Sequence, residues 1–189
     1  MAEPALLGAG CLLVATPMLL DPNFDHTVIV VLDLNEEGAL GVVLNRPSQV
    51  RVGDVLPDWS SVTTAPEVMF AGGPVGTDSA LAVAVLHDED GEDPVGFRRL
   101  FGGTGILDLD APAAVLAPAV AGLRVFAGYA GWGADQLESE IAAGAWYVVP
   151  SEHADLFGAA PEGLWTRVLR RQPGELAWVS TRPADPTWN

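Results

Sequence analysis

The chain has 189 residues and a mass of 19.7 kDa, and 49% of its residues are hydrophobic while only 18% are charged. This composition excludes an intrinsically disordered protein and is sufficient for one medium-sized domain with a single core. Nine arginines, no lysine and 25 carboxylates give a net charge of −16, which disfavours direct binding to nucleic acid.

The first apolar stretch, residues 5–20, has the hydropathy of a signal peptide but lacks a basic start, because no cation precedes Arg46. Pro17 interrupts it, and it is shorter than the roughly 18 residues that a membrane helix needs. Residues 10–16 are instead predicted to form a buried strand that hides Cys11 as an unreactive thiol. The single cysteine excludes an intrachain disulfide and a thiolate zinc cluster, so we expect a cytoplasmic protein without a membrane segment.

The next part of the chain is predicted to be a β-hairpin preceded by one helical turn. The Asp-Pro pair favours that turn over residues 21–25, and capping by Asp21 is favoured over a metal site made with Asp25 and His26. Strands are expected over residues 27–34 and 39–44, joined by the turn 35–38.

The middle of the chain is predicted to consist mainly of short strands. A short helix is expected over residues 52–56 and a loop over 57–66. Strands are expected over residues 68–71, 81–86, 97–101 and 106–109. The acidic tract 88–93 is interpreted as a solvated loop, because it lacks the ligand order of an EF-hand.

The last third of the chain is predicted to be richer in helices. Helices are expected over residues 111–121, 134–143, 151–157 (capped by Ser151) and 162–171, with strands over 123–127 and 145–149 and an extended tail from Pro173. Strands therefore come first and helices later, which predicts a single α+β domain with a mixed sheet.

The segment from Gly128 to Glu140 is the most informative part of the sequence, because three glycines and two aromatic residues lie where a strand is expected to end. We interpret Gly131-Trp132-Gly133 as a turn. It resembles half of a dinucleotide-binding loop, but Gln136 replaces the third glycine, so a packing turn is favoured over a nucleotide site.

Two glutamates follow this turn in the predicted helix. Glu138 and Glu140 diverge by about 200° around the helix axis, which excludes a catalytic pair. Both are interpreted as charges that flank a buried stripe, although Glu138 alone can face a pocket beside Tyr129.

The cationic side chains give two further candidates. Arg46 follows the hairpin at a strand end, and binding and a structural salt bridge to a carboxylate are equally favoured there. Arg167, Arg170 and Arg171 form a basic cluster, for which interaction with a helix C-terminus is favoured over docking of an acidic partner. The sequence contains no Gly-x-Ser-x-Gly or phosphate-loop motif.

Several of these blocks, in this order, resemble the AlgH/YqgE-type family of bacterial proteins. The resemblance is carried by the openings Gly10–Pro17 and Asp21–Phe24, the hairpin Glu37–Pro47, the turn Gly72–Val75 and the segment Gly128–Glu138 followed by Gly144-Ala145-Trp146. It implies one α+β domain of coiled, branching β-sheets flanked by helices, in the bacterial cytosol. Some members are labelled transcriptional regulators, and the resemblance supplies no catalytic residues.

We therefore predict a non-enzymatic binding or regulatory protein that recognises a protein partner or a small ligand. The alternatives are a small-molecule-binding protein or enzyme with Glu138 as acid or base and Gly133 at an anion site, and a direct DNA regulator. No cofactor or metal is expected. The predicted binding residues, which we expect to converge in one pocket, are Asn45, Arg46, Gly72, Gly73, Pro74, Tyr129, Trp132, Gly133 and Glu138.

Overall fold

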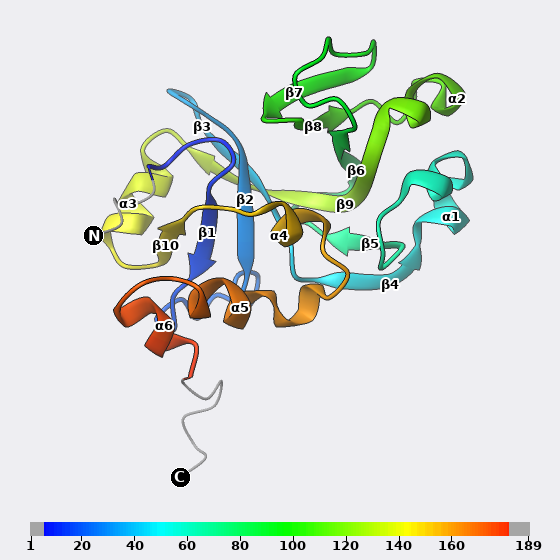
Figure 1. The fold of residues 1–189 in the computed structure, drawn as a ribbon. Coiled ribbons are helices and arrows are strands. Elements are labelled where there is room, and N and C mark those ends of the chain that lie inside the picture. Colours follow the sequence, from blue (N-terminus) through cyan, green and yellow to red (C-terminus); the bar gives the residue numbers. More distant parts are fainter. Residues whose placement is uncertain (1–5, 182–189) are drawn as a thin grey trace.

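The computed structural model describes residues 6–181, which form a curled ten-stranded sheet with short helices around it (Figure 1). The strand order is β10-β1-β2-β3-β9-β6-β8-β7, and β4 and β5 form a side branch on β9. The strands are β1 (Leu12–Ala15), β2 (Val28–Asn35), β3 (Gly38–Val43), β4 (Pro47–Arg51), β5 (Val68–Ala71), β6 (Val75–Leu86), β7 (Phe97–Phe101), β8 (Thr104–Leu107), β9 (Val120–Gly133) and β10 (Trp146–Val149).

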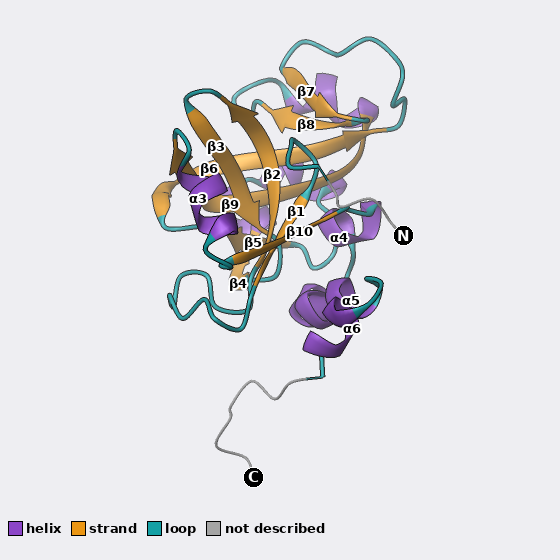
Figure 2. Ribbon diagram, turned by 90° about the vertical axis from the view of Figure 1, so that its left-hand side faces the viewer, coloured by secondary structure: helices purple, strands orange, loops and turns teal. Residues whose placement is uncertain are grey.

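The helices are short and lie at the margins of the sheet, with α5 and α6 together at one end (Figure 2). They are α1 (Val52–Val55), α2 (Ala113–Leu116), α3 (Gln136–Ala142), α4 (His153–Phe157), α5 (Leu164–Arg170) and α6 (Glu175–Val179), with 3-10 turns η1 (Pro57–Val62), η2 (Ala117–Ala119) and η3 (Pro161–Gly163). These elements confirm the predicted α+β class. Within residues 6–181 no helix combines the length and the apolar character needed to cross a bilayer.

The long strand β9 organises the architecture, because it pairs with three other strands. Its last four residues pair with β3, and its middle pairs in parallel with β5. Along its other edge it pairs with β6 in antiparallel fashion from Val120 to Tyr129. One strand therefore belongs to both branches, which makes the sheet mixed and curled.

The buried apolar side chains form three clusters on the faces of this sheet. The largest joins β1–β3 to α4 and α5, where Trp165 donates its indole N–H to the carbonyl of Ala15 at 2.9 Å. The second lies on the other face of β1–β3 and includes Trp132 and Trp146. The third packs β6, β8 and β9 against α1, η1 and α2. Cys11 is buried in the second cluster, as predicted, and burial raises the pKa of its thiol.

The predicted hairpin is confirmed by antiparallel pairing of β2 with β3, but several element boundaries are wrong. The helix predicted over 111–121 ends at Leu116, because Pro118 lies in a 3-10 turn and β9 begins at Val120. Ser151 does not cap α4; Glu152 does, with Asp155 completing the capping box, while Ser151 donates to the carbonyl of Gly10.

The remaining differences concern unexpected or longer elements. The strand β4 and the turn η1 were not predicted, and β6 begins at Val75 instead of residue 81. The tail predicted to be extended from Pro173 contains α6, and its residues 182–189 lie outside the described residues. The predicted turn at Gly131–Gly133 is wrong, because these residues belong to β9 and α3 begins only at Gln136.

Candidate functional site

A backbone crossing explains Gly72, Gly73 and Gly128, whereas a Cβ added at Gly131 or Gly133 would meet nothing closer than 3.5 Å. The chain leaves β5 on one edge of β9 and enters β6 on the other edge, so residues 72–74 pass directly over β9. A side chain at Gly72 would collide with the carbonyl oxygen of Gly128, and one at Gly73 with the backbone of Tyr129. The glycines therefore allow two backbones to touch, and they pack against each other instead of enclosing a hollow.

The polar groups that follow the hairpin hold one loop in place. Asn45 accepts the N–H of Val28 at 3.0 Å and donates to the carbonyl of His26 at 2.8 Å. Arg46 donates to the carbonyls of Asn23, Pro22 and Asp25 at 2.6, 3.0 and 3.2 Å. The partners of Arg46 are thus backbone carbonyls, not the carboxylate that a salt bridge would require.

The same loop has the predicted cap at its start. Asp21 accepts the N–H of Asn23 at 2.9 Å, and Asp25 pairs with the ring of His26 at 2.6 Å. These side chains therefore hold the turn locally.

Trp132 lies in an aromatic cluster that this loop covers. Its side chain is 6% exposed, and its ring centroid lies 6.1 Å from Trp146 and 6.4 Å from Phe24. Both indole N–H groups donate to the same oxygen of Glu140 at 2.9 Å, and Gln136 donates to the other oxygen at 3.0 Å. Glu140 is therefore a shared acceptor for two indoles, a role that helical spacing alone does not indicate.

The nine predicted residues do not lie together in one pocket. Tyr129 packs against the largest core cluster, whereas Trp132 lies in the second, because residues three apart in a strand face opposite ways. Glu138 lines a cleft of about 530 Å³ with Trp146 and Tyr147. Gly133 donates its N–H to the side chain of Gln136 at 3.0 Å. Arg46, Trp132 and Glu138 therefore do not enclose the expected pocket. Arg46 holds a packed loop, Trp132 lies in the aromatic cluster that this loop covers, and Glu138 lines a separate cleft.

None of the nine predicted residues lines a further hollow, which we call the β4 groove, although several lie next to its walls in the sequence. It has a volume of about 330 Å³ and is lined by Ser48, Val50, Val55, Leu56, Met69, Phe70, Ala71, Ala80 and Ala127. Arg46 directly precedes β4, the turn 72–74 follows β5, and Tyr129 lies two residues after Ala127. The groove was missed because β4 was not predicted.

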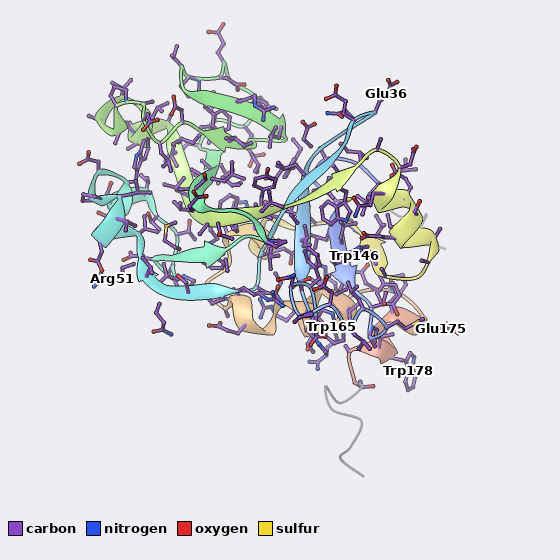
Figure 3. All side chains as sticks on the ribbon, turned by 180° about the vertical axis from the view of Figure 1, so that it is seen from behind. Glu36, Arg51, Trp146, Trp165, Glu175 and Trp178 are labelled. Atoms are coloured by element: carbon purple, nitrogen blue, oxygen red, sulfur yellow. The ribbon has the colours of Figure 1, made fainter. Side chains whose placement is uncertain are left out.

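The β4 groove is apolar and open to solvent. Val50 and Val55 are 47% and 53% exposed, and small side chains on β5, β6 and β9 form its base. It continues the third core cluster, to which Leu56 and Met69 also belong. Arg51, at the end of β4, lies well apart from Trp146 of the aromatic cluster (Figure 3). The groove and the aromatic cluster are therefore separate features.

Known relatives resemble the chain over almost its whole length. The AlgH-like family matches residues 12–177. A UPF0301 protein of Streptomyces coelicolor is 58% identical over 182 residues, which cover 95% of this chain and 94% of the relative. A UPF0301 protein of Thermobifida fusca is 54% identical over 189 residues, with the same coverage.

Two solved structures share the fold. The crystal structure of a protein from Corynebacterium diphtheriae has a TM-score of 0.87 and 33% identity and covers 95% of each chain. The solution structure of AlgH from Pseudomonas aeruginosa has a TM-score of 0.67 and 28% identity, and the match covers 97% of this chain and 98% of that one. Sequence and fold agree over nearly the whole chain, and the chain belongs to the AlgH-like family.

Proposed function

We propose that the chain is a non-enzymatic binding protein of the bacterial cytoplasm that docks a protein partner in the β4 groove. The observation that carries this proposal is an open apolar groove beside the side-branch strand β4. Exposed apolar grooves typically mark interaction surfaces, and strands at the margin of a sheet accept added strands. The occupant we propose is an extended segment of the partner.

The pairing of β4 supports a strand-like occupant. β4 is in register with β5 only at its ends, Pro47 with Phe70 and Arg51 with Val68, and the register shifts between them. In the middle, the N–H of Val50 bonds to the hydroxyl of Ser48 at 3.1 Å. A docked segment would supply main-chain partners here, while Val50 and Val55 would contact its apolar side chains.

The charges near the groove specify the flanks of the partner segment. Exposed carboxylates lie close in sequence to residues that line the groove. Arg51 is the one exposed cation in strand β4. These carboxylates are Asp54, Asp58, Glu67 and Asp78. Since the whole chain also carries a charge of −16, we propose an apolar segment with basic flanks.

A regulatory role would then act through this protein contact and not through DNA. The net charge repels a phosphate backbone, which supports a protein partner over a nucleic acid. We infer the cytoplasmic location from the single cysteine, Cys11, which is a buried free thiol and suits a reducing compartment.

The proposal is tested by selecting random twelve-residue peptides on the wild-type protein. We expect selected peptides to alternate apolar residues between Lys or Arg flanks, and the double variant Val50→Asp/Val55→Asp to weaken their binding about tenfold or more. Val95→Asp/Val115→Asp is the matched control, because both valines are exposed elsewhere and the charge change is the same. Equal weakening by both double variants, or selection of acidic flanks, would contradict the proposal.

A small ligand in the cleft beside α3 is the second candidate function. Glu138 is an exposed carboxylate on a cleft otherwise lined mainly by apolar side chains, including Trp146 and Leu176. This arrangement suits an apolar molecule with a cationic group. A metabolite screen should then raise the melting temperature of the wild type but not of Glu138→Gln, and a screen without any stabilising compound would count against this candidate.

A further inference from the structure

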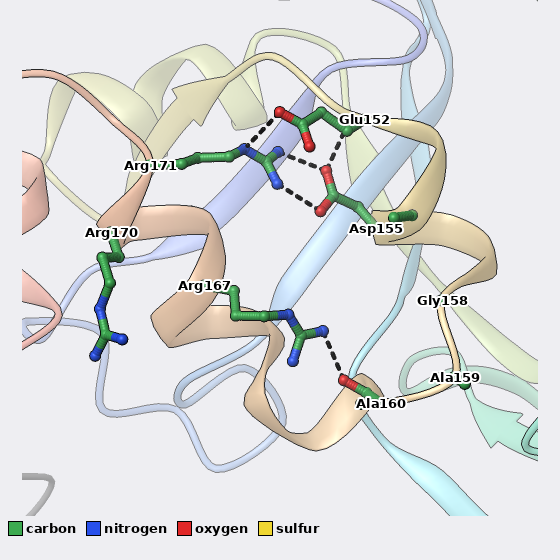
Figure 4. Close-up of a pocket in the computed structure, with 9 residues that line it drawn as sticks. Glu152, Asp155, Gly158, Ala159, Ala160, Arg167, Arg170 and Arg171 are labelled. Atoms are coloured by element: carbon green, nitrogen blue, oxygen red, sulfur yellow. Dashed lines mark hydrogen bonds and ion pairs between the residues drawn. The ribbon is translucent and has the colours of Figure 1, made fainter.

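A second cleft, which we call the arginine cleft, lies between α4, the segment 158–160 and α5 (Figure 4). Its volume is about 570 Å³. It is lined by Arg167, Arg170 and Arg171, which are three of the nine cations in the chain, and by two carboxylates, Glu152 and Asp155. Such a concentration of arginine is unusual in a protein with a net charge of −16.

Both carboxylates of the cleft are already engaged by one arginine. Arg171 donates to the two oxygens of Asp155 at 2.7 and 2.5 Å, and its Nε lies 3.5 Å from Glu152. Asp155 also accepts the N–H of Glu152 at 2.7 Å, and its side chain is 4% exposed. The hydrogen bond to Asp155 raises the pKa of Arg171. Arg171 and the two carboxylates therefore form an ion-paired part of the cleft wall that keeps one formal negative charge.

The other two arginines have no carboxylate partner among residues 6–181. Arg167 donates one N–H to the carbonyl of Ala160 at 2.6 Å, which aims its guanidinium along the cleft (Figure 4). Arg170 lines the rim and makes no side-chain hydrogen bond or ion pair within the described residues. A guanidinium has five N–H donors, so most donors of this pair are free to bind an anion.

A fourth arginine adds positive charge behind the same wall. Arg124 is 1% exposed and donates to the carbonyls of Leu156 and Gly158 at 2.9 and 3.1 Å. Within the described residues it has no carboxylate partner, and its Nε has no partner at all. Four arginines and three carboxylates, Glu152, Asp155 and the exposed Glu162 of η3, thus leave this region with one formal positive charge.

We propose that the arginine cleft binds a small phosphorylated molecule. Arg167 would donate to the phosphate oxygens, since arginine forms charge-assisted and often bidentate bonds to phosphate. Arg170, whose guanidinium points away from that of Arg167 in Figure 4, would add positive charge at the rim. The volume of the cleft lies in the range of small-molecule sites, and the acidity of the rest of the chain disfavours a long polyanion.

Isothermal titration of the whole chain with inorganic pyrophosphate at low ionic strength tests this site. We expect a Kd below about 1 mM, weakened about tenfold or more in Arg167→Gln/Arg170→Gln. Arg51→Gln/Arg98→Gln is the matched control, because it makes the same charge change at two other exposed arginines and should stay within about twofold of the wild type. Circular dichroism and melting temperature verify that each variant is folded.

Three results would overturn the site: no heat of binding by the wild type up to about 10 mM pyrophosphate, equal weakening in both double variants, or sulfate bound as tightly as pyrophosphate. The last result would indicate general anion attraction. The site does not depend on the β4 groove, so Val50→Asp/Val55→Asp should leave pyrophosphate binding unchanged.

Discussion

Replacing Arg124 with methionine should lower the free energy of unfolding by about 3 kcal/mol, one of the two largest effects we expect. The guanidinium donates to the carbonyls of Leu156, Ala65 and Gly158 at 2.9, 2.8 and 3.1 Å and lies 4.5 Å from the ring centroid of Phe70. Methionine has a comparable volume but no donor. Three carbonyls would therefore lose their donor in or near the core.

This expectation is not obvious, because hydrophobic replacements of buried charges are often neutral or stabilising. That result holds when every member of a charged network is replaced, and backbone carbonyls cannot be replaced. Urea unfolding at pH 7 measures the effect. Arg124→Lys, which keeps one charged donor, should fall between methionine and wild type, whereas a methionine variant as stable as wild type would contradict our account.

The contribution of Arg124 to the free energy of unfolding should depend on pH. Burial lowers the pKa of Arg124 to about 10, so the guanidinium stays charged in the folded protein at pH 7. Between about pH 10 and the ordinary pKa of arginine, the unfolded chain holds more protons than the folded one, so the wild type should gain stability relative to Arg124→Met as pH rises. From about pH 6 to 9 the difference between the two proteins should be constant.

Local patterns were sufficient to predict the hairpin but not the groove. The continuous β-branched run from Val28 to Val31 is typical of a strand buried on both faces, and it forms the first half of β2. The sequence Pro47-Ser48-Gln49-Val50-Arg51 has only one large apolar residue, so no period indicates that it forms β4. Its pairing is decided by β5, which is about twenty residues away in the chain.

The aromatic cluster shows the same limit for side-chain chemistry. Helical spacing correctly separates Glu138 from Glu140, but it does not show that two indoles converge on Glu140. That convergence depends on the packing of β9, β10 and α3 against one another. The glycines of this segment likewise indicated an unusual backbone conformation near Gly128. The contact that requires a glycine there is with Gly73, which lies more than fifty residues away in the sequence.

Gly128→Ala should therefore be strongly destabilising, costing about 4 kcal/mol or preventing folding. The φ angle of Gly128 is +75°, which is unfavourable for alanine, and an added Cβ would lie 2.5 Å from the carbonyl oxygen of Gly73 and 2.9 Å from that of Val75. Both obstacles are backbone atoms of the crossing chain, so no side-chain rotation relieves them.

Gly144→Ala is the matched control, because Gly144 has nearly the same φ, +82°, but open space where the Cβ would lie. It should cost only about 1 kcal/mol, the conformational penalty alone. Chemical denaturation of both variants, with expression yield in soluble form as the readout if Gly128→Ala does not fold, separates the two contributions. Equal losses of stability would mean that the crossing relaxes around a methyl group, and the glycines of residues 72, 73 and 128 would then need a functional explanation in place of the packing one.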